Sequence, residues 1–422
     1  MQTTGPLDVD RPDGTQTDGV VSGTVQPGFE PAAEAFRENF SRRGEIGASF
    51  CAYHRGQRVV DLWGGVADPA SGRPWQAETL CVIFSATKGL ASAAVLSAAE
   101  AGAIDYDAPV RELWPELAKD SLEDLTLRHL MNHRAGLVAL DQPVTVRDLT
   151  EPERLLPILE SQQPIWPPGE RQGYHGISFG LYLPEIFRRA TGTTLGRWLA
   201  DKVTGPLGAD AYLGLPEEHA ERLATLVPVG PLERLAKLIP WVIRHNTVER
   251  RLLRALLDKR SLTSRAFAHP RELGAGGLAR FHDPDVRRLE LPWAGGIASA
   301  RGLARVYAAL ACGGTLDGTT ICRPEALRPI EERQSWQAPD AVLLKAMGWS
   351  QGFLKEEGGI FSPNPAAFGH PGAGGALGFC DPTRQLAWAY VMNRMDFRLR
   401  SPRAIALSQA LYRCPAIRSG TT

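Results

Sequence analysis

Segments with the pattern of β-strands lie near both ends of this chain, and segments with the pattern of helices lie between them. Residues 47–53 and 58–63 flank a short turn and have the composition of a hairpin. Residues 376–379 and 385–392 have the same strand-like character near the other end. From residue 85 to about 280 the pattern is mainly helical, with breaks at proline and glycine. The sequence therefore predicts an α+β fold, in which both chain ends build one antiparallel sheet beside an all-helical lobe.

Helices are expected where apolar residues recur at helical spacing. Four such segments stand out, at residues 30–43, 86–101, about 300–311 and about 402–412. No internal repeat is evident, and we expect a single domain over residues 29–415. Its sheet lobe would comprise about 29–80 and 290–415, and its helical lobe about 81–289.

The two ends of the chain are expected to lie outside this domain. Residues 1–28 are polar and rich in glycine, threonine and aspartate, which is typical of a flexible lead-in. They lack the basic start and the apolar core of a secretory signal. Residues 416–422 are expected to form a short tail.

The charge balance excludes several classes of partner. The chain has 47 basic and 47 acidic residues, so its net charge is zero. This argues against nucleic acid or an anionic membrane as the main partner. No run of about 18 apolar residues exists, so no membrane span is predicted. A homo-oligomer stays open.

The six cysteines are scattered, without a CxxC pair or a His/Cys cluster at zinc spacing. We therefore interpret them as reduced thiols and predict neither a metal nor a cofactor. Together with the missing signal, this makes the cytoplasm the expected location.

The tetrad Ser85-Ala86-Thr87-Lys88 is the strongest chemical signal in the chain. It follows the apolar run 79–84 and opens the predicted helix 86–101, where free backbone N–H groups favour negative charge. Residues i and i+3 are neighbours on a helix, so Lys88 would lie over Ser85. An amine with a lowered pKa can take the proton that a serine must lose to become a nucleophile. The tetrad alone also fits an N-cap serine beside a solvated lysine.

Two other patterns of catalytic residues are weaker. Residues 176–180 match G-x-S-x-G around Ser178, but that motif needs a preceding strand, and residues 167–173 are a poor strand. We interpret this match as accidental. His129 and His133 stand four residues apart and could hold a metal, but no third ligand is apparent. We favour a structural role, with His133 bonded to backbone at a helix end.

Two further segments indicate a function only when they are considered together with the tetrad and in their order along the chain. Tyr174 follows the loop 166–173, and a lone tyrosine usually belongs to a core or a surface. Residues 370–375 are rich in glycine and precede a strand. They could form a bulged strand or let a substrate approach the backbone, but they lack the features of a phosphate loop.

Residues 231–260 carry leucine stripes among arginines and lysines. The plain interpretation is a pair of amphipathic helices that pack on the helical lobe. A mobile lid or a subunit contact is the sharper alternative. A basic helix on a membrane surface is weaker, because Glu233, Glu249 and Asp258 interrupt the positive charge.

Together these residues resemble the serine β-lactamase/penicillin-binding-protein superfamily, and within it the class C-like branch that includes the family VIII carboxylesterases. The family carries S-x-x-K, Y-x-N or a variant, and K-T-G, often W-x-G or H-x-G in the esterases. This chain has Ser85-Ala86-Thr87-Lys88, Tyr174-His175-Gly176 and His370-Pro371-Gly372 in that order. Supporting stretches lie at 126–137, 166–169, 369–375 and 379–382, and the resemblance spans about residues 35–412.

The resemblance implies a β-lactamase/transpeptidase-like fold and an acyl-enzyme on Ser85. Lys88 and Tyr174 would share the serine proton, with tyrosinate character at Tyr174 supported by a nearby ammonium. Backbone N–H groups of Ser85 and Ala373 would hold the oxyanion. Candidate substrate-binding residues are His175, His370, Gly372 and Gly374.

Two departures favour a carboxylesterase acting on small-molecule esters over a β-lactamase. Gly176 stands where lactamases have asparagine, and His370 stands where they have lysine. An acyltransferase or transesterase, an amidase, a peptide-cyclising thioesterase and a β-lactamase stay open on the same fold. The alternative from a different functional class is a non-catalytic scaffold that keeps the fold but has lost turnover.

Overall fold

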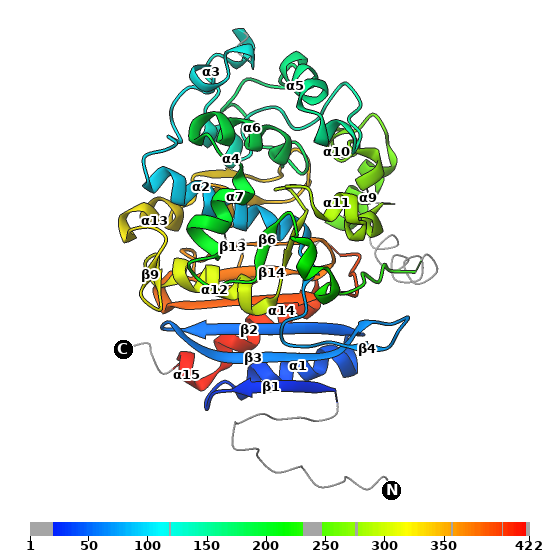
Figure 1. The fold of residues 1–422 in the computed structure, drawn as a ribbon, viewed down its shortest axis with the longest axis vertical. Helices are drawn as coiled ribbons and strands as arrows, with labels where there is room; N and C mark the ends of the chain where they lie inside the picture. The colour runs from blue at the N-terminus through cyan, green and yellow to red at the C-terminus, as the bar shows by residue number, and fades with distance from the viewer. Residues whose placement is uncertain are drawn as a thin grey trace, which may run out of the picture.

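A single antiparallel sheet runs through the lower half of the molecule, below a lobe made mainly of helices (Figure 1). The computed structural model describes residues 20–117, 120–230, 247–274, 277–355, 358–398 and 400–418. The strands follow the order β1-β3-β2-β15-β14-β13-β12-β11-β10, and β4 pairs with β3 outside this path. The α+β fold expected from the sequence is confirmed.

The centre of the sheet joins the two ends of the chain. The predicted hairpin is β2 (Gly47–His54) and β3 (Gln57–Asp68), and the predicted late strands are β14 (Leu377–Asp381) and β15 (Leu386–Met392). β2 pairs with β15 along its length. The remaining strands of this sheet are β1 (Val21–Val25), β4 (Arg73–Pro74), β10 (Ser335–Gln337), β11 (Met347–Ser350), β12 (Phe353–Lys355) and β13 (Phe368–Pro371).

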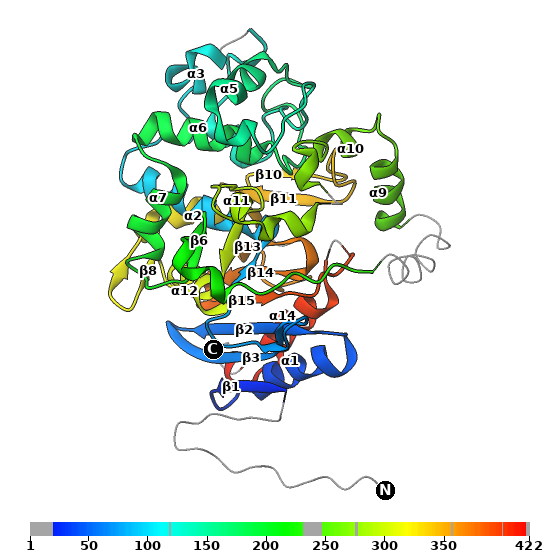
Figure 2. The ribbon, with the colours of Figure 1, turned by 45° about the vertical axis from the view of Figure 1, so that its right-hand side comes forward.

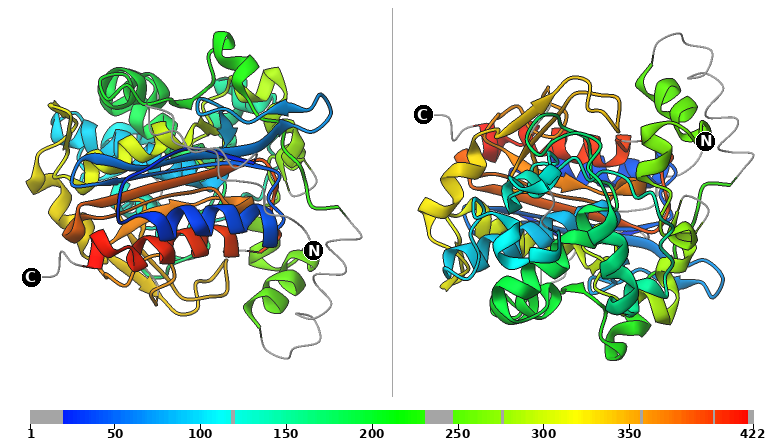
Figure 3. Two further views of the ribbon diagram at one scale, coloured as in Figure 1. Left: turned by 90° about the horizontal axis from the view of Figure 1, so that it is seen from below. Right: turned by 90° about the horizontal axis from the view of Figure 1, so that it is seen from above.

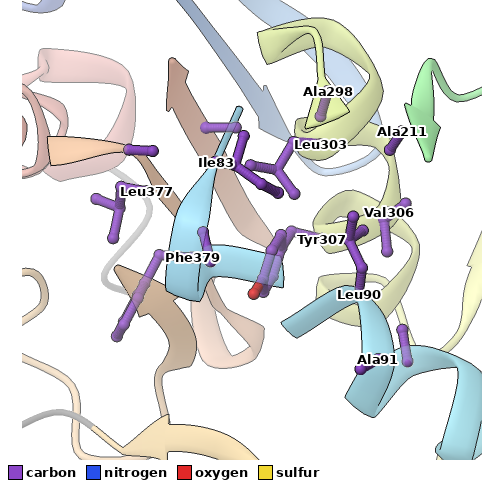
Figure 4. Packing of buried hydrophobic residues seen from close by; sticks show 14 of the residues in the cluster. Ile83, Leu90, Ala91, Ala211, Ala298, Leu303, Val306, Tyr307, Leu377 and Phe379 are labelled. Carbon is purple, nitrogen blue, oxygen red and sulfur yellow. The ribbon is translucent and has the colours of Figure 1, made fainter. Parts of the chain in front are cut away.

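Helices cover both faces of the sheet. On one face α1 (Glu30–Arg42) and α14 (Pro402–Arg413) lie side by side (Figure 3). On the other face α12 (Ala300–Ala311) packs on β2, β14 and β15. Tyr307 of α12 belongs to a buried cluster with Phe379 of the sheet and Leu90 of the helical lobe (Figure 4). This apolar contact joins the two lobes, and the helices predicted at these positions are confirmed.

The helical lobe is built around α2 (Thr87–Glu100), which is buried along most of its length. Figure 2 shows α9 and α10 on one flank of this lobe. The remaining helices of the described residues, of which α15 contacts α14 at the sheet end, are α3 (Val110–Leu113), α4 (Leu127–Met131), α5 (Pro152–Ser161), α6 (Phe179–Thr191), α7 (Leu195–Leu199), α9 (Val248–Leu257), α10 (Leu262–Ala266), α11 (Pro284–Arg287), α13 (Pro324–Glu331) and α15 (Pro415–Arg418). Within the described ranges, no helix combines the length and the apolar character needed to cross a membrane.

Two small sheets complete the fold. One has the order β5-β7-β6, formed by β5 (Cys81–Val82), β7 (Gly296–Ala298) and β6 (Ala211–Leu213). The other is the hairpin of β8 (Thr315–Leu316) and β9 (Thr319–Thr320). β5 leads directly into the turn that carries Ser85, so the three-stranded sheet determines the position of this candidate nucleophile.

The structure corrects the expected limits of the domain. Val21–Val25 form the edge strand β1, because their backbone pairs with β3, so the flexible lead-in predicted for 1–28 is wrong for these residues. Residues 1–19 lie outside the described part. At the other end, α15 extends to Arg418, so part of the predicted tail is helical. Residues 419–422 also lie outside the described part.

A buried ion pair ties α14 to the start of the sheet. Arg403 of α14 donates from Nη1 to Glu45 Oε1 at 2.6 Å, and both side chains are almost completely buried. The Tyr390 hydroxyl of β15 donates to the same carboxylate. Arg403 Nη2 also donates to the carbonyls of Gly374, at 3.3 Å, and Arg394, at 2.5 Å. One guanidinium therefore connects the scaffold to the loop that follows β13.

We expect Glu45→Ala to lower the free energy of unfolding by about 3–5 kcal/mol, because it leaves the Arg403 guanidinium buried without its carboxylate. Urea unfolding followed by circular dichroism measures this loss. The control is Arg42→Ala, which removes an exposed ion pair with Glu38 and should cost at most about 1 kcal/mol. Equal losses in the two variants would contradict the role assigned to the buried pair.

Candidate active site

Ser85 lies in a tight turn between the small sheet and the helical lobe. The turn, Phe84–Ala86, is a 3₁₀ segment that follows β5 and precedes α2. Phe84 has φ +46°, a left-handed conformation that is unfavourable for a residue with a side chain. Its carbonyl accepts a hydrogen bond from the Thr87 hydroxyl, which itself accepts the N–H of Gly296 at 2.8 Å. These bonds hold the turn that presents Ser85.

Lys88 lies one helical turn beyond Ser85 and is completely buried. Its Nζ donates to the carbonyls of Gly176 and Trp293, both at 2.9 Å. Burial lowers the pKa of the Lys88 amine well below its usual range, which favours the neutral form. A neutral amine has two hydrogens and one lone pair. The two carbonyls take the hydrogens, and the lone pair stays available for a proton.

The Tyr174 phenol meets both of these groups. Its ring centroid lies 5.0 Å from Lys88 Nζ, and an interaction with the Ser85 side chain acts to lower the pKa of its hydroxyl. Burial raises the pKa of Tyr174 by more than this interaction lowers it. The resting phenol is therefore neutral. The structure thus brings the three predicted catalytic residues together, and burial disfavours both charges of the expected tyrosinate–ammonium pair.

Asp340 fixes the backbone that carries Tyr174. Its carboxylate accepts the N–H groups of Tyr174 at 3.1 Å and of Val342 and Leu343 at 2.9 Å. The side-chain amide of Gln172 adds a fourth bond at 3.1 Å. The sequence analysis missed Asp340. Its bonds to residues two and three positions ahead are a local turn pattern, but the bond to Tyr174 spans 166 residues and has no signal in the sequence.

The loop after β13 places a second backbone donor beside the serine. A Cβ atom on Gly372 would lie 2.1 Å from the Ile83 carbonyl oxygen, so only glycine lets this loop approach the turn that carries Ser85. Ala373 follows and is exposed to the cavity. Among the described residues, no backbone acceptor is recorded for the N–H groups of Ser85 and Ala373. Gly374 also lines the cavity, with φ +82°.

The two candidate histidines differ in position. His370 lines the cavity beside Tyr174, with ring centroids 6.3 Å apart. His175 is completely buried and does not line the cavity, so its predicted contact with substrate is wrong. Its Nδ1–H donates to the Gly173 carbonyl at 2.8 Å, and its backbone N–H donates to His133 Nδ1 at 3.1 Å. Burial lowers the pKa of His175 to about 3, so it supports the site from behind as a neutral ring.

An apolar cavity of about 430 Å³ opens in front of these groups. Phe84 and Phe281 form one side, with ring centroids 5.5 Å apart. Leu252 and Leu256 of α9 contribute to another part of the wall. The second half of the segment predicted as amphipathic helices therefore forms a wall of the cavity, whereas residues 231–246 lie outside the described part.

The weaker motifs do not join this site. Ser178 is buried at the start of α6 and does not itself line the cavity, although the preceding residues Gly176 and Ile177 do, and no strand precedes it. The accidental origin of the G-x-S-x-G match is confirmed. His133 accepts a backbone N–H, as expected for a structural residue. In the part of the chain that the structure describes, no three side chains of His, Cys, Asp or Glu are grouped so as to hold a metal ion.

Comparison with known proteins gives a consistent picture. A family model described as Beta-lactamase matches residues 32–411. The Esterase/beta-lactamase LipL of Mycobacterium tuberculosis (strain ATCC 25618 / H37Rv) is 33% identical over 389 residues, which cover 91% of this chain and 85% of that protein. The crystal structure of a family VIII carboxylesterase is 36% identical with a TM-score of 0.82, covering 93% of this chain and 99% of that one. The structure of EstA from Arthrobacter nitroguajacolicus Rue61a is 28% identical with a TM-score of 0.78, covering 94% and 99%.

The buried neutral amine of Lys88 predicts a specific dependence of stability on pH. Its folded pKa lies below the unfolded value of about 10.4, so between these two values only the unfolded chain binds the proton. Relative to Lys88→Met, the free energy of unfolding of the native protein should therefore rise with pH by about 1.4 kcal/mol per unit in this window. Denaturant unfolding of both proteins between pH 7 and pH 10 measures the difference. Lys202→Met, at an exposed lysine, serves as control, and a flat difference for Lys88→Met would contradict the neutral amine.

Proposed function

The chain belongs to the beta-lactamase family, and from this premise we propose that it is a serine hydrolase that cleaves carboxylic esters through an acyl-enzyme on Ser85. The carboxylesterase and esterase names of its relatives support an ester as the substrate. The apolar cavity supports a small molecule with apolar groups next to the ester bond.

The observation that carries the proposal is the Lys88 amine, buried without a carboxylate partner and held by two carbonyls. Burial between two carbonyls is not enough by itself, because Lys355 is held in the same way by the carbonyls of Glu331 and Ala366 and does not line the cavity. Lys88 differs because its amine lies beside the Tyr174 ring and one helical turn from Ser85. The lowered pKa of Lys88 favours the neutral amine, whose lone pair is what a general base needs. Ser85 and Tyr174 are the hydroxyl groups near it.

In the proposed acylation, Ser85 Oγ attacks the ester carbonyl carbon and its proton passes to Tyr174 and Lys88. The N–H groups of Ser85 and Ala373 stabilise the oxyanion, and one such donor contributes about 3–4 kcal/mol to the transition state. The tetrahedral intermediate then collapses, and the leaving alcohol takes the proton from the Tyr174–Lys88 pair. An acyl acceptor attacks the ester of Ser85 in the same way, with the same pair as base.

Two positions favour an ester over a β-lactam. A Cβ atom on Gly176 would lie 2.4 Å from Phe267 Cε1, so the phenylalanine ring fills the space that an asparagine side chain at this position would need. His370 replaces the lysine of the lactamase motif. Burial lowers the pKa of His370 well below its usual range, so it offers no fixed positive charge to a substrate carboxylate.

We keep the cytoplasm as the proposed location. All six cysteines are free, and five of them are buried, which fits a reducing compartment. A homo-oligomer stays a prediction.

We expect Ser85→Ala to abolish hydrolysis of short p-nitrophenyl esters and covalent labelling by a fluorophosphonate probe, because no other nucleophile replaces Oγ. Ser178→Ala is the matched control and should keep nearly full activity, since Ser178 does not line the cavity. Release of p-nitrophenol and mass spectrometry of the labelled peptide measure the two effects. Loss of activity in Ser178→Ala but not in Ser85→Ala would show that Ser85 is not the nucleophile.

The pH profile of kcat/KM should have one limb on the acid side, where activity falls as Lys88 gains a proton. Because burial lowers the Lys88 pKa, this limb should lie well below the usual lysine value of about 10.4. The raised pKa of Tyr174 places loss of the phenol proton above pH 10, so no alkaline limb is expected below that pH. Initial rates with a non-ionising ester measure the profile, which Lys202→Met should leave unchanged. A limb centred near pH 10 would refute Lys88 as the base.

A further inference from the structure

His370 lines the cavity wall, and its two ring nitrogens differ. One has a hydrogen-bond partner, and the other has none among the described residues. Its Nδ1 lies 2.7 Å from the Pro371 carbonyl oxygen. A carbonyl oxygen can only accept, so Nδ1 must carry the hydrogen. In a neutral imidazole the other nitrogen, Nε2, then has a lone pair and no hydrogen.

His370 Nε2 is buried, and no described residue supplies a hydrogen bond to it. Burial lowers the pKa of the ring well below its usual range, which favours the neutral imidazole with its lone pair free. A buried acceptor without a donor costs free energy. In the wall of a cavity beside Tyr174, that acceptor is suited to a ligand group that carries a hydrogen.

We propose that His370 is a further catalytic residue, whose Nε2 accepts a hydrogen bond from the water molecule that hydrolyses the acyl-enzyme. This inference rests on the proposed acyl-enzyme at Ser85. It also predicts which molecule the acyl group is transferred to. The site offers the attacking molecule two groups that can take or accept a hydrogen: the base formed by Tyr174 and Lys88, and His370 Nε2.

Water and alcohols differ in how many of these acceptors they satisfy. As water attacks the acyl carbon, one hydrogen passes to the Tyr174–Lys88 pair and the second donates to His370 Nε2. When the bond between the acyl carbon and Ser85 Oγ breaks, Oγ takes the transferred proton back and the carboxylic acid leaves. An alcohol has one hydroxyl hydrogen, which must go to the base, so His370 gains nothing from it. His370 therefore favours hydrolysis over transfer to an alcohol.

Two substitutions separate the two ring nitrogens. The side-chain amide of His370→Asn can replace Nδ1–H toward Pro371 but does not reach the position of Nε2. The longer His370→Gln places its carbonyl oxygen near the position of Nε2. Both variants are polar and similar in size to histidine, and their thermal unfolding is compared with that of the native protein first.

The experiment uses p-nitrophenyl butyrate in buffer with a fixed concentration of methanol, and measures butyric acid and methyl butyrate by chromatography. We expect the ratio of acid to methyl ester to fall about tenfold in His370→Asn, the factor that corresponds to the loss of one hydrogen bond. His370→Gln should restore most of the native ratio. The burst of p-nitrophenol, which reports acylation, should persist in His370→Asn and be followed by a slower steady state.

An unchanged product ratio in His370→Asn would overturn the assignment, and so would loss of the burst together with the steady state, because His370 would then act in acylation. A failure of the proposed function has a different signature. In that case the native protein itself would show neither a burst nor an acyl adduct on Ser85 by mass spectrometry.

Discussion

The burial of one amine between two carbonyls is the constraint on which this site depends. Lys88 receives its hydrogen-bond partners from Gly176 and Trp293, which are 88 and 205 residues away along the chain. Neither partner carries a negative charge, so the environment selects the neutral amine. The backbone at Gly176 must therefore stay close to α2, and the ring of Phe267 occupies the side-chain space that this glycine leaves. The protonation state of Lys88 therefore depends on the same packing that holds the helical lobe together.

The remaining parts of the site come from the sheet. β13 ends at Pro371, and Gly372 brings the following loop against Ile83, so that Ala373 and Ser85 approach from different lobes. Arg403 binds the carbonyl of Gly374 in this loop and the carboxylate of Glu45 beside the sheet. A charged group in the scaffold therefore restrains the donor loop, although it does not touch the cavity. The same guanidinium therefore contributes to stability and to the position of the loop that carries Ala373.

Long elements with a clear period were predictable, and long-range contacts were not. The hairpin of β2 and β3 and the helix α12 follow from local patterns, and the ordered motifs around Ser85, Tyr174 and His370 indicated the family before any coordinates. The strands β10 to β13 were missed, because each has only three or four residues and pairs through loops. His175 was misplaced because residues adjacent in sequence can face opposite directions. The pKa directions of Lys88 and Tyr174, which disfavour the expected tyrosinate–ammonium pair, follow from complete burial of both groups, a property of the packed lobes that no motif encodes.

The unusual backbone of Phe84 has a consequence for how freely this cavity can change. A left-handed residue with a side chain costs about 1–2 kcal/mol, and burial of a phenylalanine ring contributes about 1.5–3 kcal/mol. The ring, packed against Phe281, therefore offsets the strain of the turn that carries Ser85. The same ring is also part of the cavity wall. Substitutions at Phe84 that reshape the cavity for another acyl group would therefore also destabilise the turn that carries Ser85. Leu252 and Leu256 of α9 line the cavity without contributing to that turn, so the substrate range can change more freely through α9.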